Sequence, residues 1–301
     1  MLEMFQQYLE EKGKSDNTIK SYMNHVKGYV KWFEQEKQME FTKLYQDNVK
    51  EYVKHLESVG NNPKTINAKL NAIRSLGEWF TSIGVQEHPI NVSNAYQKVQ
   101  TEYASLAKIS KQDVEHFRQW VLENGSYRNY TIVTLLAYCG LRISEALHLK
   151  LNDIHLVSRE LVVTGKGNKK RIVMISDKVA EVLTTYINER DTDSDYLFVS
   201  RQGNVINRTV INKLFKEYST HRHFLFEKNF RESTNKNFQQ DFEKSFTLTP
   251  HDLRHFFCSH ALEIGFTFPE VANQAGHSNI QTTMQYTNPS KQKMLEKINQ
   301  M

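Results

Sequence analysis

The first 84 residues carry apolar side chains at intervals of three and four, a spacing that restricts this segment to amphipathic helices. The clearest stripe comprises Ile19, Tyr22, Met23, Val26, Tyr29, Val30 and Phe33. A later helix has Asn62 as its cap and Pro63 at its first position, and it stops at Gly84. We therefore predict a helical bundle of four helices, which forms a domain of residues 1–87.

The second part of the chain combines helices with a few strands. Residues 88–107 show no sustained period and are interpreted as an interdomain linker. Ser110 and Asp113 then match a helix-start box. Three β-like runs, IHLVS, ELVVTGKG and KKRIVMIS, are joined by short turns, and helical patterns surround them. The sequence predicts a mainly α protein with one small antiparallel β-sheet, in which residues 108–301 form the larger domain.

The composition excludes several classes of protein. No apolar run among the 301 residues approaches the roughly 20 that a membrane-spanning helix needs, and the N-terminus lacks the pattern of a signal peptide. Cys139 and Cys258 lie in apolar helical patterns far apart, which indicates reduced core thiols in a cytoplasmic protein. The net charge of +5 is compatible with a nucleic-acid partner but does not require one.

The stretch TPHDLRHFFCSH raises the question of a metal site, because His251 and His255 have the spacing of a zinc-protease helix. That chemistry needs a glutamate after the first histidine, where this chain has Asp252. Arg254 would also place a fixed cation one turn from the metal, and it has no lone pair to offer. A third ligand would be required, and His277 has no obvious ligand setting. We predict no metal and keep a zinc hydrolase as a remote alternative.

The same stretch also fits phosphate binding. On a helix that begins at Thr249, His251 and Arg254 project from one face, near the positive end of the helix dipole. Arginine can give a phosphate two parallel N–H donors. Taken alone, however, such a pair is more often an ordinary surface pair.

Two further cations extend this hypothesis. Arg142 lies in the apolar segment GLRISEAL, where an arginine is unexpected unless it faces a polar site, and Glu145 one turn later could orient it. Lys166 stands between two glycines at the tip of a predicted hairpin. Its alternative interpretation is a solvated cation in an ordinary turn.

In this order, the residues resemble the pattern of the tyrosine recombinase, or phage integrase, family, and in particular its Xer-like and transposon-encoded site-specific recombinases. The stretches that carry the resemblance are AYCGLRISEALHLKLNDI, GKGNKKRIVMI, TPHDLRHFFCSHAL and AGHSNIQTTMQYT. The resemblance implies a SAM-like, core-binding N-terminal domain and a catalytic C-terminal domain. It assigns catalysis to Arg142, Lys166, His251, Arg254, His277 and Tyr286, with Glu145 and His255 in supporting positions. Two features depart from the family pattern: Ala275 stands where members usually have leucine, and the polar segment 227–246 is longer than usual.

The function implied is a site-specific recombinase that cuts and rejoins duplex DNA through a 3′-phosphotyrosine, with no metal, ATP or other cofactor. Its role would be integration, excision or resolution of a mobile element in the bacterial cytoplasm. An enzyme that relaxes DNA in the manner of type IB topoisomerases is the alternative, and a DNA-binding protein that has lost catalysis is a further one.

The expected partners are a double-stranded recombination site and further copies of the chain, which would be a monomer or dimer in solution and a tetramer in the synapse. Lys64, Lys69 and Arg74 are candidates for contacts with DNA, and a solvated surface is the alternative. The tail PSKQKMLEKINQM would form a helix that either docks into a neighbouring subunit or folds back on its own domain.

Overall fold

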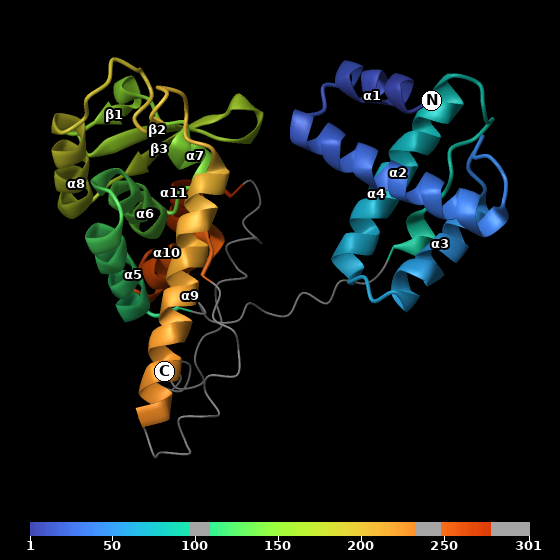
Figure 1. The fold of residues 1–301 in the computed structure, drawn as a ribbon. Coiled ribbons are helices and arrows are strands. Elements are labelled where there is room, and N and C mark those ends of the chain that lie inside the picture. The colour runs from blue at the N-terminus through green and yellow to red at the C-terminus, as the bar shows by residue number, and fades with distance from the viewer. Residues whose placement is uncertain (97–108, 233–247, 278–301) are drawn as a thin grey trace, which may run out of the picture. The chain divides into compact units, whose positions relative to one another are not determined.

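The computed structural model describes residues 1–96, 109–232 and 248–277 (Figure 1). The chain divides into two compact units, Met1–Thr101 and Glu102–Met301. Each unit encloses a hydrophobic core of its own.

The first unit is the predicted bundle of helices. Its elements are α1 (Leu2–Glu11), α2 (Asp16–Lys37), α3 (Gln46–Ser58), α4 (Pro63–Ser82) and the short 3-10 helix η1 (Ser93–Ala95). The Asn62 side chain accepts the backbone N–H of Thr65 at 2.8 Å, and Pro63 occupies the first helical position, so α4 begins where the sequence predicts. Aromatic rings fill much of the core, among them Phe5, Tyr29, Trp32, Phe33, Phe41, Tyr52, Trp79 and Phe80.

The segment assigned to the linker begins with packed residues. Val92 is buried in the core of the first unit, and the Tyr96 hydroxyl donates a hydrogen bond to the Asn71 side chain of α4 at 2.5 Å. Residues 88–96 contain no α-helix, as the missing helical period indicated. Val92 and Tyr96 nevertheless pack against the bundle. Residues 97–107 lie outside the described ranges.

The second unit contains the remaining elements that the structure describes. Its helices are α5 (Lys111–Asn124), α6 (Tyr127–Cys139), α7 (Ile143–Leu147), α8 (Asp177–Asn188), α9 (Arg208–Glu232), α10 (Pro250–Glu263) and α11 (Phe268–Ala275). The strands are β1 (Ile154–His155), β2 (Glu160–Thr164) and β3 (Lys170–Met174), and the 3-10 helices are η2 (Leu151–Asp153) and η3 (Lys166–Asn168). The reciprocal capping bonds between Ser110 and Asp113 begin α5, as the sequence predicts.

The small sheet is antiparallel with the order β1-β2-β3, which confirms the predicted fold class. In β2 and β3 the register runs from Glu160 opposite Met174 to Thr164 opposite Lys170. Val163 and Val173 turn into the core, whereas Met174 is exposed, so the strands show the alternation of a half-buried sheet.

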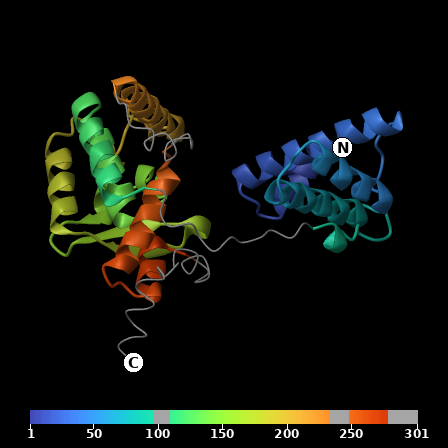
Figure 2. The ribbon, with the colours of Figure 1, turned by 90° about the horizontal axis from the view of Figure 1, so that it is seen from below.

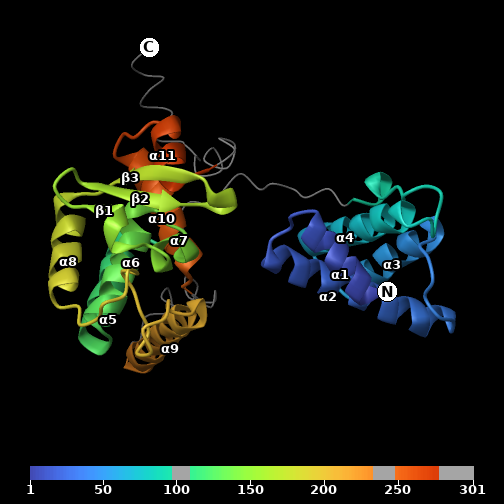
Figure 3. The ribbon, with the colours of Figure 1, turned by 90° about the horizontal axis from the view of Figure 1, so that it is seen from above.

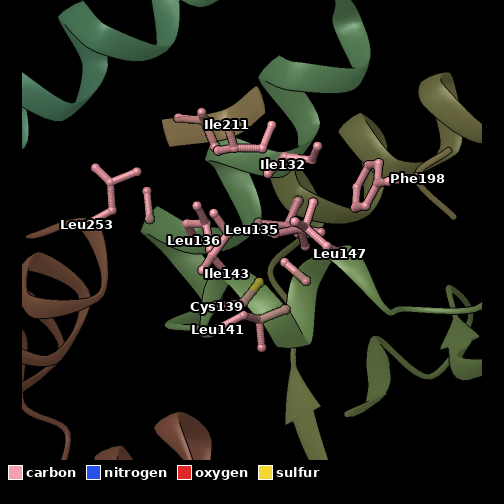
Figure 4. Close-up of a cluster of buried hydrophobic side chains, with 14 of the residues drawn as sticks. Ile132, Leu135, Leu136, Cys139, Leu141, Ile143, Leu147, Phe198, Ile211 and Leu253 are labelled. Atoms are coloured by element: carbon pink, nitrogen blue, oxygen red, sulfur yellow. The ribbon is translucent and has the colours of Figure 1, made fainter. Parts of the chain in front are cut away.

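Helix α6 packs against α5, α8 and α10 at the centre of the second unit, which Figure 2 shows from below and Figure 3 shows from above with these helices labelled. Leu135, Leu136 and Cys139 of this helix meet Leu253 of α10 and Leu147 of α7 in one apolar cluster (Figure 4). Cys139 and Cys258 are both buried free thiols, in agreement with the prediction. Helix α11 lies beside β3 (Figure 3). In the described ranges, no helix combines the length and apolarity needed to cross a bilayer.

The ring of Phe117 on α5 offers a test of how the second unit is held together. It is fully buried, and its centroid lies 4.7 Å from the ring centroid of Phe215 and 4.6 Å from that of Tyr218, both on α9. We expect Phe117→Ala to lower the free energy of unfolding by about 3–5 kcal/mol in urea denaturation of the full chain, because it removes buried contacts and leaves a cavity. The exposed Leu122 of the same helix provides the control: Leu122→Ala should cost less than about 1 kcal/mol. Equal losses in the two variants would contradict this packing.

Candidate active site

The turn between α6 and α7 fixes the first catalytic candidate, Arg142. Arg142 caps α7, and Glu145 accepts its backbone N–H at 2.9 Å and its guanidinium Nη1 at 2.8 Å. The Glu145 side chain is only 3% exposed, whereas that of Arg142 is 41% exposed. The buried Glu145 carboxylate thus holds both the backbone and the guanidinium of Arg142, whose side chain remains partly exposed.

Glu145 binds a second arginine as well. Arg171 of β3 donates from Nη1 to Oε1 at 3.0 Å and from Nη2 to Oε2 at 2.9 Å. Burial alone would raise the pKa of the Glu145 carboxyl, but the bonds from Arg171 and Arg142 outweigh it and hold that pKa below its usual range. One buried carboxylate therefore lies between two guanidinium groups.

Helix α10 supplies Arg254. Its side chain is buried, and Nη1 donates to the carbonyl of Gly140 at 2.5 Å. Gly140 ends α6 with a positive φ of 63°, and a Cβ there would lie 2.3 Å from the ring of Phe257. Only glycine fits this close approach of α6 to α10, and the approach brings Arg254 to the turn that precedes Arg142.

The start of α10 also bears on the zinc alternative. Asp252 accepts bonds from the backbone N–H of Thr249 at 2.8 Å and from its hydroxyl at 2.6 Å. The carboxylate that would act as the base of a zinc protease is thus part of the helix cap. His251 is exposed at the beginning of the helix, and His255 is half-buried one turn later. Within residues 1–96, 109–232 and 248–277, no three His, Cys, Asp or Glu side chains gather as a metal site would require.

The end of α11 brings His277 to Arg142. Gly276 has a positive φ of 70°, its carbonyl accepts Nη2 of Arg142 at 2.9 Å, and His277 follows it. Burial lowers the pKa of the His277 imidazole to about 4, together with the charges of Arg254, Arg142 and Arg171, while the charge of Glu145 opposes the shift.

Lys166 belongs to η3 in the turn between β2 and β3, which is the predicted hairpin tip. A Cβ on the preceding Gly165 would lie 3.5 Å from Nη1 of Arg171 and 3.5 Å from Oε1 of Glu145. The base of the hairpin therefore rests on the pair formed by Glu145 and Arg171. The side chain of Lys166 lies outside what the structure describes.

The structure brings Arg142 and Arg254 close enough for their charges to act on His277, and Arg142 is paired with Glu145. His251 lies on the same helix as Arg254, at its exposed beginning. Tyr286 falls outside the described residues, as do the C-terminal tail and most of segment 227–246.

Sequence reasoning missed Arg171. The signal was present, because Arg171 is in phase with the buried Val173 of the same strand, where alternation predicts an apolar residue. An arginine at an inward strand position requires a buried acceptor, and here the acceptor is Glu145.

The three N-terminal cations do not share one face of α4. A spacing of five residues turns each about 140° from the last. Lys64 is exposed, Nζ of Lys69 lies 5.9 Å from the ring centroid of Tyr52, and Arg74 lies 3.8 Å from Glu78. Burial lowers the pKa of Lys69.

Comparisons with known proteins identify the family of both parts of the chain. Residues 102–293 match the phage integrase family, and residues 1–87 match the N-terminal SAM-like domain of phage integrases. The TnP I resolvase of Bacillus thuringiensis is 40% identical over 98% of this chain and 97% of its own length. The tyrosine recombinase XerD of Staphylococcus haemolyticus is 31% identical over 96% of this chain and 94% of its own.

Solved structures share the fold at lower identity. The integrase of transposon Tn1549 in complex with transposon right-end DNA has a TM-score of 0.66 and 20% identity, and covers 100% of this chain and 98% of that one. The XerH recombinase in a post-cleavage complex with a palindromic difH substrate has a TM-score of 0.69 and 19% identity, and covers 93% and 79%.

The low pKa of His277 predicts how stability depends on pH. An unfolded histidine with a pKa of 6.5 binds a proton more readily than His277 in the folded chain, where the pKa is about 4. The contribution of His277 to stability is therefore complete above about pH 6.5 and is lost as the pH falls towards 4. The measurement is the free energy of unfolding in urea at pH 7 and at pH 4. Allowing for solvent screening, we expect this free energy to fall by about 1–2 kcal/mol less in His277→Asn than in the parent chain. If the variant loses stability with acid as steeply as the parent chain, the assignment is wrong.

Proposed function

The chain belongs to the phage integrase family, and on that premise we propose that it is a site-specific tyrosine recombinase that acts on the DNA of a mobile element. The convergence of Arg142, Arg254 and His277 carries the proposal, because three groups from separate helices and turns can meet one phosphate. The name of the Bacillus thuringiensis relative, a resolvase, and the transposon integrase among the structural neighbours support a role in mobile elements.

The proposed reaction exchanges phosphate esters. The hydroxyl oxygen of Tyr286 attacks a backbone phosphorus, the bond to the 5′-oxygen breaks, and the 5′-oxygen leaves as a hydroxyl after it takes a proton. A 5′-hydroxyl from another strand then attacks the 3′-phosphotyrosine and releases the tyrosine. Because each step replaces one phosphate ester by another, no nucleotide hydrolysis is needed, and we propose that the reaction requires neither ATP nor a metal.

The main electrostatic problem is the negative charge on the non-bridging oxygens in the transition state. In the proposal, Arg142 and Arg254 bind these oxygens and His277 donates a further hydrogen bond. The low pKa of His277 supports this role, since a neutral imidazole has one N–H to donate. Loss of one such donor typically costs about 10²–10³ in rate.

Two proton transfers complete the proposed chemistry. The tyrosine phenol has an ordinary pKa near 10, so a base must take its proton at neutral pH, and His251 at the exposed start of α10 is the candidate. Lys166 at the hairpin turn is the candidate acid for the leaving 5′-oxygen. Arginine could not replace it, because it barely deprotonates.

We further propose that residues 1–87 bind the core of the recombination site, that residues 88–107 link the two domains, and that residues 108–301 perform catalysis. The titles of the related structures, which contain DNA, support double-stranded DNA as the partner. The chain would act as a tetramer in the synapse, and phosphate contacts would make its binding salt-dependent. Lys64, Lys69 and Arg74 would each contact DNA separately, since they point in different directions from α4.

Replacement of the nucleophile tests the proposed reaction. Tyr286→Phe keeps the ring but removes the attacking oxygen, so we expect no covalent protein–DNA adduct on gel electrophoresis of denatured reactions, with duplex binding unchanged. Tyr45→Phe, at an exposed tyrosine of the first unit, is the control and should form adducts normally. Adducts formed by the Tyr286 variant would refute the assignment. Relaxation of supercoiled plasmid by the parent chain, without exchange between paired sites, would favour a type IB relaxing enzyme.

Truncation after Pro289 tests the role of the tail. If the tail docks into a neighbouring subunit, the shortened chain should bind a single DNA site normally but lose tetramer assembly and recombination between sites. Mobility shifts and analytical ultracentrifugation with paired sites measure both properties. Unchanged assembly and recombination would show that the tail is not needed between subunits.

A further inference from the structure

Arg171 has no part in the reaction proposed above, yet it contacts several elements of the candidate active site. Its side chain is 13% exposed, and its guanidinium donates to both oxygens of Glu145. We propose that Arg171 is a positioning residue, which holds Arg142 and His277 in the orientation that meets one phosphate. This inference rests on the proposed function.

The Glu145 carboxylate is shared between two arginines. Arg171 takes both oxygens in a bidentate pair, while Arg142 takes one oxygen by its side chain. Of the three groups Glu145, Arg142 and Arg171, removal of Arg171 would leave Arg142 as the one cation paired with the buried carboxylate. The carboxylate would then attract the Arg142 guanidinium inward. With Arg171 in place, two positive charges and one negative charge leave the group with a net positive charge for a phosphate.

Arg171 also contacts the chain that leads to His277. Nε of Arg171 donates to the carbonyl of Gln274 at 3.2 Å. A Cβ on Gly276 would lie 2.5 Å from the central carbon of the guanidinium, so the turn lies directly on Arg171. The carbonyl of Gly276 accepts the bond from Arg142, and Arg171 therefore supports both partners of that bond.

The end of α11 is also attached to the sheet. The Gln274 side chain accepts the backbone N–H of Met174 at 3.1 Å and donates to the Met174 carbonyl at 2.6 Å, so that it pairs with the edge of β3. Gly165, next to Lys166, also lies against Arg171 and Glu145. One guanidinium thus connects α7, β3, α11 and the base of the hairpin, whereas an ordinary surface pair connects two side chains.

Arg159 provides a matched control, because it also forms an ion pair near this sheet, but its pair is far more exposed than that of Arg171. Its Nε donates to Asp177 at 2.8 Å, with exposed fractions of 43% for Arg159 and 89% for Asp177. Such a pair contributes little to stability. Arg159→Gln removes an arginine of similar chemistry without a contact to the site.

The first test is the titration of His277, followed by NMR of histidine-labelled full chain without DNA. The charged groups that face His277 are Arg254 from α10, Arg142 and Glu145 from α7, and Arg171 from β3. We expect Arg171→Gln to raise the pKa of His277 by at least about half a unit, because it removes one of three repelling cations. Arg159→Gln should leave it unchanged. An unaltered titration in the folded Arg171 variant would overturn the proposal.

The second test is the rate of covalent adduct formation in a single turnover, on a nicked duplex recovered by selection with the parent chain. We expect Arg171→Gln to slow this step by about 10–100-fold with unchanged affinity for the duplex, because small displacements of catalytic groups are costly. Arg171→Lys keeps the charge but loses the bidentate pair, so it should retain a nearly normal His277 pKa and cleave at an intermediate rate.

The outcomes separate the two proposals. If the parent chain forms no adduct on any selected duplex, the proposed function fails, and the titration still reports on Arg171. If the parent chain forms adducts and Arg171→Lys and Arg171→Gln cleave at the parental rate, the positioning role is wrong. Should Arg171→Gln fail to fold by circular dichroism, Arg171→Lys alone decides: a parental rate overturns the proposal and a slowed rate with normal binding supports it.

Discussion

The buried carboxylate of Glu145 is the interaction on which the candidate site depends. A carboxylate with 3% of its side chain exposed is stable only if cations and hydrogen bonds compensate its lost hydration, and Arg142 and Arg171 supply both. The compensation also builds the site, because the two arginines come from α7 and β3. Since Arg171 reaches the turn after α11 and Arg142 bonds to Gly276, the ion pairs draw three separate parts of the chain together. A fold that must satisfy Glu145 therefore places cations beside His277.

Two glycines allow the backbone to come close enough for this arrangement. Gly140 and Gly276 each end a helix with a positive φ, and each carbonyl accepts a bond from a catalytic candidate, Arg254 and Arg142 respectively. A side chain at either position would meet a ring or a guanidinium at 2.5 Å or less. The same feature that terminates the helix thus also orients an arginine. In this mainly helical protein, the turns at two helix ends therefore position the arginines of the candidate site.

The cluster has the properties that phosphoryl chemistry without a metal would need. Arginines remain charged at any physiological pH, and burial together with the charges of Arg254, Arg142 and Arg171 lowers the pKa of His277, so that its imidazole is neutral near pH 7. Fixed donors in a partly buried site stabilise developing charge more strongly than mobile donors in water do. The chain belongs to the phage integrase family, and its relatives include proteins named TnP I resolvase and tyrosine recombinase XerD.

The sequence by itself determined the helical bundle, the small antiparallel sheet, the helix starts at Asn62, Ser110 and Thr249, and the motifs that resemble the family, because capping, periodicity and motif spacing are local properties. It did not identify Arg171 as the second partner of Glu145: alternation along β3 marks Arg171 as an inward residue, but Glu145 is 26 residues away and only the tertiary structure brings the two together. Nor could it show that Val92 and Tyr96 pack on the bundle, or that Lys69 lies over the ring of Tyr52. The sequence gives the type of each residue, whereas the proximity of Arg142, Arg254 and His277 depends on carbonyls and charges from distant segments. Tertiary structure alone decides that meeting, because only close packing brings such groups within hydrogen-bond distance.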